Sequence, residues 1–512
     1  MKFQKIFYLL TIGLFFFASC QQSANLDNDK ALSQIPATTS SVTAINIKQI
    51  MEKADFQEVV KMDFYQDMVK EATTRTPSIA AVLNDPYQSG VDLDANAYFI
   101  QDLDISGQIP FNALIVNIKD KAAFEKLAMT GQTNPSKNGE GFVFVEPERG
   151  SIIAWNDNIA VMGAGGSKSN IQTHTANIFS TTAETSVGQN KDLQRCLAKN
   201  SDISSWFGSD ELAEKAVKEM GPAIAMAGFS KDMLKENFAH SHFNFENGLV
   251  DATSTYTINP ELSKEFGILF KDEVNTDFTK YISGTNLIFA TSGALSMEGI
   301  NEAITKRSMN SLANGQLREF GLTTDDIAEA MDGDFVVAGF YTPSSDEPNM
   351  LFGTKINDRT TFDKFLSLGE EFEMIKKMDD NLYEVISRTL QRNTNGVTQL
   401  VIHDDILFLT NDSEMIAQIK SGGYSKSDRI SDKANDILQN NIMGGYINFE
   451  HAAKYNTDKE VNLDELEDAI FRFDGDDGTF KLEMKDKDIN SLKKLFQWLN
   501  EKYKTDKSNN VI

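Results

Sequence analysis

The chain has 512 residues, of which 41% are hydrophobic, and a formal net charge of −26. An acidic excess of this size argues against binding of nucleic acid and against electrostatic docking on anionic lipid, because both require basic patches. The length exceeds what a single hydrophobic core supports, so we expect two or more domains.

The N-terminus has the three parts of a secretory signal. Lys2 and Lys5 form a basic start, an apolar run extends from Phe7 to Ala18, and small residues follow. The apolar run is too short to span a bilayer, which takes about 20 residues as a helix. No other window approaches that length without charge, so we expect no transmembrane helix in the mature chain.

The four residues Phe17-Ala18-Ser19-Cys20 have the pattern of a bacterial lipobox, a bulky apolar residue and two small ones before a cysteine. In such signals the cysteine thiol is lipidated and the chain is cut just before it, which makes residues 1–19 the signal peptide. Two or more acyl chains give stable anchoring. We therefore predict a membrane-anchored protein of the bacterial cell envelope, attached through Cys20. The alternative is a secreted protein with an incidental cysteine.

Residues 20–37 are polar, contain one proline and lack apolar periodicity, so we expect a flexible tether there. The signal peptide removes two lysines, which takes the formal charge of the mature chain from −26 to −28.

The rest of the chain contains five pairs of similar segments, in the same order in each half. They are Thr38–Ile47 with Ser283–Ser292, Asp94–Gln101 with Asp332–Phe340, Ala113–Leu127 with Leu351–Leu366, Ser151–Gly163 with Thr398–Thr410, and His242–Ile258 with Phe471–Lys485. Each match alone is weak, but five in order indicate an internal duplication. We predict two related copies, residues 38–276 and 277–505, followed by a disordered tail at residues 506–512.

Each copy has the pattern of an α+β fold. An opening strand is followed by a helical region, at Lys48–Ala72 in the first copy and Met297–Met331 in the second. Apolar runs around Asn156-Asp157-Asn158 and around His403-Asp404-Asp405 predict hairpins, because Asn and Asp tolerate turn conformations. Hairpins outnumber strand–helix–strand units, so we expect mainly antiparallel sheets with flanking helices.

Three helix boundaries are also predicted. Ser209 should cap a helix that ends at Gly221-Pro222, and Asn259-Pro260 should begin another. In the second copy a closing helix is indicated by residues at helical spacing, namely Leu492, Leu495, Phe496, Leu499 and Tyr503.

Possible metal sites are weak in the sequence. His240 and His242 lie two residues apart on an expected strand, which places both imidazoles on one face, but no third ligand is evident nearby. Loops from Asp92 and from Asp474 lack the glycine and glutamate that a calcium-binding EF-hand loop needs at positions 6 and 12. We therefore assign no metal ligand and no cofactor, and interpret the two loops as turns.

No catalytic motif is evident either. Gly163–Ser169 resembles a phosphate loop but lacks glycine directly before Lys168. Cys196 is expected to be a buried, inert thiol, since His174 and His240 could approach it only through the fold. The chain has neither the Gly-x-Ser-x-Gly elbow nor the His-Glu-x-x-His motif of hydrolases.

The lipobox, the segment IPATTSSVTAINIKQIMEKA, the segment SGVDLDANAYFI and the following strand with KDKAAFEKL together resemble an uncharacterised family of Bacteroidota lipoproteins, a domain of unknown function. The resemblance covers most of the mature chain and implies no catalytic residue, only lipid attachment at Cys20. Because acidic residues do not directly follow Cys20, the sequence leaves open whether the protein faces the periplasm or the cell surface.

We therefore expect a non-enzymatic, lipid-anchored binding or scaffold protein of the outer membrane, with an envelope protein or a small ligand as its partner. Two alternatives remain. One is a hydrolase whose site is assembled only by the fold, and the other is a carrier of a hydrophobic molecule, suggested by the 35 phenylalanines.

Overall fold

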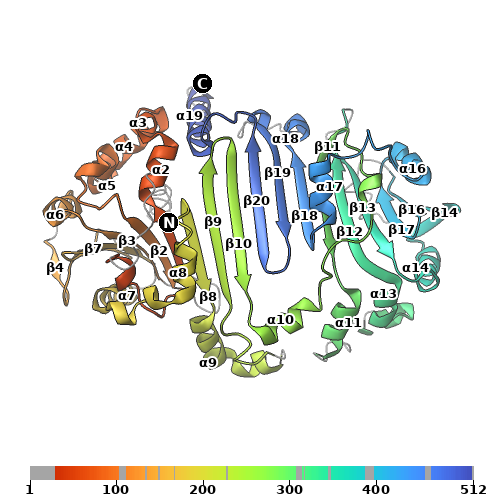
Figure 1. Ribbon diagram of the computed structural model, residues 1–512, viewed down its shortest axis with the longest axis horizontal. Coiled ribbons are helices and arrows are strands. Elements are labelled where there is room, and N and C mark those ends of the chain that lie inside the picture. The colour runs from red at the N-terminus through yellow and green to blue at the C-terminus, as the bar shows by residue number, and fades with distance from the viewer. Residues whose placement is uncertain are drawn as a thin grey trace. The chain divides into compact units, whose positions relative to one another are not determined.

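The computed structural model describes residues 29–75, 77–102, 111–132, 135–147, 150–165, 168–226, 229–306, 314–315, 317–343, 347–386, 397–455 and 463–509. Cys20 and the predicted signal peptide lie outside these ranges. The chain divides into two compact units. Figure 1 labels their helices and strands. Unit 1 comprises residues up to 224, 230–257 and 486 onward, and unit 2 comprises residues 225–229 and 258–485.

The strands of unit 1 form one antiparallel sheet. Its order is β10-β9-β8-β1-β2-β3-β7-β6-β5-β4. The bounds are β1 (Ser41–Asn46), β2 (Asn96–Asp102), β3 (Phe111–Asn117), β4 (Lys137–Asn138), β5 (Val143–Val145), β6 (Ser151–Trp155), β7 (Ile159–Ala164), β8 (Ile203–Gly208), β9 (Phe238–Glu246) and β10 (Leu249–Thr257).

Helices and short 3-10 turns accompany this sheet. They are η2 (Leu32–Gln34), α2 (Ile47–Ala54), α3 (Phe56–Val59), α4 (Asp63–Arg75), α5 (Pro77–Asn84), η3 (Pro86–Gln88), α6 (Lys121–Met129), α7 (Lys168–Ser180), η4 (Ala183–Thr185), η5 (Val187–Gln189), α8 (Lys191–Leu197), α9 (Asp210–Met226) and α19 (Ser491–Asn509). Successive side chains of a strand point to opposite faces of the sheet, so one strand supplies two cores. Val42 and Ala44 of β1 join a cluster with Cys196 of α8, whereas Ile45 joins a cluster with α2 and α19.

Unit 2 also has one antiparallel sheet, in the order β20-β19-β18-β11-β12-β13-β17-β16-β15-β14. The bounds are β11 (Leu287–Ala294), β12 (Met331–Phe340), β13 (Asn349–Ile356), β14 (Ile375–Asp379), β15 (Leu382–Val385), β16 (Gln399–His403), β17 (Ile406–Thr410), β18 (Met443–Asn448), β19 (Leu466–Phe473) and β20 (Asp477–Met484).

The helical elements of unit 2 accompany two further apolar clusters, one around Phe408 and one around Phe362. The helical elements of unit 2 are α10 (Pro260–Gly267), η6 (Thr279–Tyr281), α11 (Met297–Lys306), η7 (Arg318–Phe320), α13 (Thr324–Ala330), α14 (Arg359–Glu371), α16 (Ser413–Lys420), α17 (Asp432–Gln439), α18 (Phe449–Ala452), η8 (Ala453–Tyr455) and η9 (Leu463–Glu465). The predicted α+β class with antiparallel sheets is therefore confirmed.

The strand orders of the two units correspond position by position, β10 with β20, β1 with β11, and β4 with β14. Each of the five segment pairs noted in the sequence falls on strands at the same place in the two orders. For example, the Ser151–Gly163 segment covers β6 and β7, and its match covers β16 and β17. The predicted hairpins are both present, the second with Asp404 and Asp405 in left-handed conformation.

The boundaries differ from those expected from the sequence. The part of unit 1 that precedes residues 258–485 ends at Thr257, whereas the sequence predicted an end at residue 276. Unit 1 also includes the C-terminal helix α19, which we expected to belong to the second copy. Helix α19 extends to Asn509, so the expected disordered tail is helical at residues 506–509. Its apolar stripe packs in unit 1 because Leu492 and Phe496 complete the cluster beneath α2 and α4.

The expected tether is also shorter than residues 20–37. From Asp29 onward the chain is part of unit 1, where η2 places Leu32 and Ile35 in the core. The helix expected to end at Gly221-Pro222 begins as predicted, but it continues to Met226 with non-helical angles at Met220. Asn259 and Pro260 begin α10 as predicted, and the Asn259 side chain accepts a hydrogen bond from the backbone N–H of Glu261.

Candidate functional site

A row of four polar side chains lies along strand β9 of unit 1. His240, His242, Asn244 and Glu246 alternate with other residues, and alternate residues of a strand share one face. Each of the four contacts a different group of a neighbouring element: Asp192 of α8, Ser204 of β8, the backbone N–H of Asp202, and Lys53 of α2. We call these four residues the β9 polar row.

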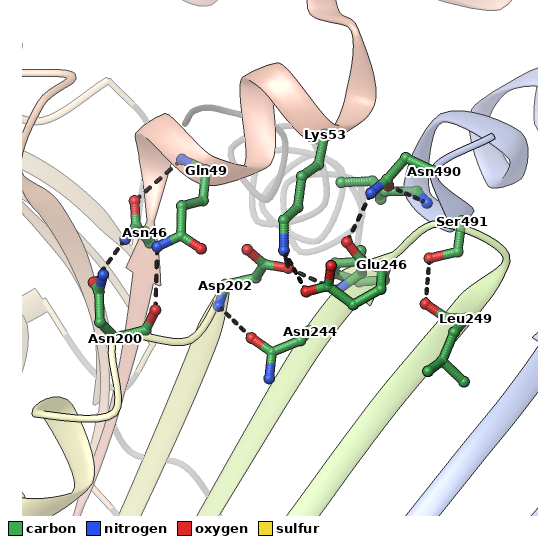
Figure 2. Close-up of polar contacts among 12 residues, drawn as sticks. Asn46, Gln49, Lys53, Asn200, Asp202, Asn244, Glu246, Leu249, Asn490 and Ser491 are labelled. Atoms are coloured by element: carbon green, nitrogen blue, oxygen red, sulfur yellow. Dashed lines mark hydrogen bonds and ion pairs between the residues drawn. The ribbon is translucent and has the colours of Figure 1, made fainter. Parts of the chain in front are cut away.

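One end of the β9 polar row surrounds a buried carboxylate, Asp202 (Figure 2). Its Oδ2 accepts hydrogen bonds from Lys53 Nζ at 2.8 Å and from the backbone N–H of Phe245 at 2.7 Å. Lys53 also lies 3.0 Å from Glu246 Oε1. Burial raises the pKa of Asp202, and the hydrogen bond from Lys53 opposes that rise. The lysine therefore compensates a charge that burial alone would disfavour.

Asn46 and Gln49 fix the start of α2 beside this carboxylate (Figure 2). The Asn46 side chain accepts from the backbone N–H of Gln49 at 3.1 Å and donates to Asn200 Oδ1 at 3.0 Å. Gln49 donates to the Asn200 carbonyl at 3.1 Å. Because α2 carries Lys53, these bonds hold the lysine against Asp202.

The turn between β9 and β10 is fastened to the start of α19 (Figure 2). Asn490 Nδ2 donates to the Phe245 carbonyl at 2.8 Å, and Ser491 Oγ donates to the Leu249 carbonyl at 2.9 Å. Gly248 in this turn has φ +63°, and a Cβ there would lie 2.7 Å from the Cα of Lys487. The close approach of two chain segments therefore requires glycine at this position.

The other end of the β9 polar row contains three ligands of a kind that metals use. Cys196 Sγ, one nitrogen of His240 and one nitrogen of His242 lie within 4.8 Å of one another. The Cys196 thiol is fully buried and donates to the Ser205 carbonyl at 3.5 Å. The fold thus brings Cys196, which lies more than 40 positions earlier in the sequence, to the two histidines that strand spacing places on one face.

Polar side chains of neighbouring elements orient the two imidazoles. His240 Nε2 donates to Asp192 Oδ2 at 3.0 Å, and Ser204 Oγ lies 3.3 Å from His242 Nδ1. Asp192 is also paired with Arg195. Neither Asp192 nor Ser204 stands out in the sequence, where the only signal is that Asp192 lies close to Cys196 and Ser204 lies on a strand that neighbours β9.

Burial sets the protonation of this cluster. It raises the pKa of the Cys196 thiol to about 12 and lowers the pKa of His242 to about 4. A thiol with so high a pKa is a poor nucleophile, and an imidazole with so low a pKa is a poor general base. Ser204 is also buried, so the Ser204–His242 contact offers no surface to a substrate.

The remaining sequence candidates have structural partners. Asp92 and Asp94 form a turn that faces Lys119, and Asp474 lies in the β19–β20 turn near Arg472. His174 stacks on Phe111, His403 lies 3.5 Å from Asp404, and His451 contacts the Leu287 carbonyl at 2.8 Å. Residues 166–167 of the glycine-rich Gly163–Ser169 segment lie outside the described residues, and α7 begins at Lys168.

Comparison with solved structures returns a weak likeness. Chains titled "Structure of crystal form I of TP0453" and "Structure of crystal form III of TP0453" match with TM-scores of 0.26 and identities of 8% and 9%. Each match covers 48% of this chain and 89% of the other. No curated protein matches the chain. A family model described as "Domain of unknown function (DUF4836)" matches residues 33–429, and the chain therefore belongs to that family.

Proposed function

We propose that this protein is a lipid-anchored binding or scaffold protein of the bacterial cell envelope, attached through Cys20, with an envelope protein or a small ligand as its partner. The supporting observation is the short distance along the chain between the lipobox cysteine and the folded body. Eight residues separate Cys20 from Asp29, where the described structure begins. At ~3.3–3.6 Å per residue, they span about 30 Å at most.

Asp29 is firmly attached to unit 1. Its Oδ2 accepts from the Tyr98 hydroxyl at 2.6 Å, and its Oδ1 accepts from Asn117 Nδ2 at 3.1 Å. Burial is the main cause that raises the pKa of Tyr98, so this hydroxyl stays protonated and remains a donor. An acyl anchor at Cys20 would therefore hold unit 1 within a few nanometres of a membrane surface. Among the described residues, no helix has the length and apolar character to cross a bilayer.

Two observations favour binding over catalysis. The Cys196–His242 cluster is buried and poorly suited to proton transfer, as its pKa values indicate. The matching strand orders and the five matched segments support an internal duplication, which gives the chain two units of one design. Such an arrangement suits a protein that presents surfaces to partners rather than one that builds a single reaction centre.

The anchor is tested by replacing Cys20 with alanine in the native host. Wild-type protein should partition with membranes and carry the mass of a diacyl or triacyl modification, whereas C20A should be unprocessed or soluble. C196A is the matched control, since it removes the other cysteine and should leave partitioning unchanged. Membrane partitioning and mass of C20A equal to those of wild type would refute the anchor.

The binding role is tested separately by cross-linking in intact cells, followed by purification of tagged wild-type protein from detergent-solubilised envelopes. A defined partner or ligand should be enriched reproducibly with wild type and reduced with C20A, which mislocalises the same folded body. No enrichment above an untagged strain in repeated preparations would overturn the binding role without affecting the anchor.

A further inference from the structure

The cluster of Cys196, His240 and His242 contains an unsatisfied polar atom. His242 is 1% exposed, and its Nε2 has no hydrogen-bond partner within the described part of the chain. Buried polar atoms without partners are rare in native proteins, and each requires an explanation. A bound ion that accepts the Nε2 lone pair supplies one.

In each imidazole, one ring nitrogen contacts a neighbouring polar side chain and the other is left for an ion. Asp192 holds Nε2 of His240, and Ser204 faces Nδ1 of His242. This leaves Nδ1 of the first histidine and Nε2 of the second to bind an ion. Histidines that bind metals almost always donate their other N–H to a carboxylate, carbonyl or similar group, as His240 does here.

We propose that Cys196, His240 and His242 bind a Zn²⁺ ion that joins helix α8 to strand β9, with Asp192 and Ser204 as positioning residues. One thiolate and two imidazoles are the ligand types that zinc prefers. In a tetrahedral zinc site the ligand atoms lie about 3.3–3.6 Å apart. Cys196 Sγ and one nitrogen of each imidazole, which lie within 4.8 Å of one another, would need to approach by about 1 Å on binding.

The charges of the site also suit a divalent ion. Binding releases one proton from the Cys196 thiol, because a coordinating thiol is deprotonated. The ion and the thiolate then carry one net positive charge, and the Asp192 carboxylate, which is shared with Arg195, lies next to that charge through its hydrogen bond to His240. His240 retains 13% exposure of its side chain and gives the ion a path from solvent, while the other two ligands are buried.

Unit 2 shows that the fold itself does not require these residues. Helix α17 occupies the place of α8 before β18, and neither α17 nor β19 contains cysteine or histidine. There Lys433 Nζ pairs with Asp468 Oδ1 at 2.7 Å and joins α17 to β19 by an ion pair, and Ile437 is buried. The same contact between helix and strand is therefore made without metal ligands. The cysteine and the two histidines of unit 1 are thus not needed for the fold, which favours a role in binding an ion.

The proposal is tested on the full chain in detergent after removal of metals with dipicolinate. Titration with ZnCl₂ against a chromophoric chelator should give one ion per chain and a higher midpoint of thermal unfolding. Co²⁺ should give a thiolate charge-transfer band. C196S, H240Q and H242Q should each bind Zn²⁺ at least tenfold more weakly, while H403Q and C20S, which alter a histidine and the cysteine outside the site, should bind as wild type does.

Circular dichroism of each metal-free variant establishes whether it is folded. If a ligand variant does not fold, D192N takes its place in the test. It should weaken binding by about 10- to 100-fold, as expected for a positioning residue, without loss of the fold. Failure of folded wild type to bind Zn²⁺, or equal binding by C196S and H403Q, would overturn the site. Binding of Cu²⁺ with a thiolate band but no binding of Zn²⁺ would overturn the assignment of zinc.

Discussion

Lys53 Nζ lies 2.8 Å from Asp202 Oδ2, and the Asp202 side chain is fully buried whereas that of Lys53 is 20% exposed. The two residues come from α2 and from the position before β8. They therefore join α2 to the start of β8, the strand that pairs with β9 and its polar row.

We predict that K53M lowers the free energy of unfolding by about 3 kcal/mol, because it leaves a buried carboxylate without its cation. Urea unfolding followed by far-UV circular dichroism measures this. K61M is the matched control: Lys61 pairs with Glu58 at 2.7 Å, but both side chains are more than half exposed. Such a surface pair contributes about 0–1 kcal/mol. Equal losses in the two variants would contradict a special role for Asp202.

The N-cap of α14 should produce a pH-dependent contribution to stability. Asp358 accepts a hydrogen bond from the backbone N–H of Thr361, and this bond lowers the pKa of Asp358 below its ordinary value of 3.8. A lowered carboxyl pKa stabilises the folded state above the ordinary value, and that contribution is lost as pH falls through the lowered one. D358N keeps a capping oxygen but no charge. The stability difference between wild type and D358N should therefore be largest near neutral pH and vanish in acid. A difference independent of pH would contradict this.

Gly444 of β18 should not tolerate alanine. A Cβ there would collide with the carbonyl oxygen of Ile437, because α17 lies directly on the strand. We expect G444A to lower the free energy of unfolding by about 1–3 kcal/mol, as overpacking does. A Cβ added to Gly267, at the end of α10, would meet no atom of the described residues within 4 Å. G267A should therefore be neutral or stabilising by up to about 1 kcal/mol. Denaturant unfolding compares the two, and a neutral G444A would contradict the contact.

Cys196 should be inert toward thiol reagents in the folded protein. Only a thiolate reacts, and burial raises the pKa of Cys196 to about 12. In metal-free C20S protein, where Cys196 is the remaining cysteine, Ellman's reagent at neutral pH should release no colour until denaturant is added. Rapid labelling of the native protein would show that α8 opens readily from the sheet.

The fold class was predictable from local patterns, because hairpins, helix caps and apolar stripes each depend on residues that are close together in the sequence. The Asn259-Pro260 cap and the stripe of α19 are examples. The apolar stripe of α19 does not, however, indicate which of the hydrophobic clusters the helix packs against. Lys493 pairs with Asp55 at 2.7 Å and Tyr503 donates to Asp67 at 2.7 Å, and both partners are more than 430 positions away. That choice depends on long-range complementarity.

The candidate metal site was half predictable for the same reason. Strand periodicity alone places His240 and His242 on one face. Cys196 joins them only because α8 packs across β8 and β9, and nothing in the seven-residue helix KDLQRCL specifies that crossing. Asp192 and Ser204 are ordinary polar residues in the sequence, and their positioning contacts exist only in the folded unit.

The place of α19 has a consequence for biosynthesis. Unit 2 is enclosed in sequence between two segments of unit 1, since residues 258–485 precede the helix that packs against α2 and α4. During synthesis, unit 2 is therefore complete before unit 1 receives its last helix. Unit 1 begins first in the chain but lacks α19 until all of unit 2 has followed, so its apolar surface beneath α19 stays uncovered until that helix arrives.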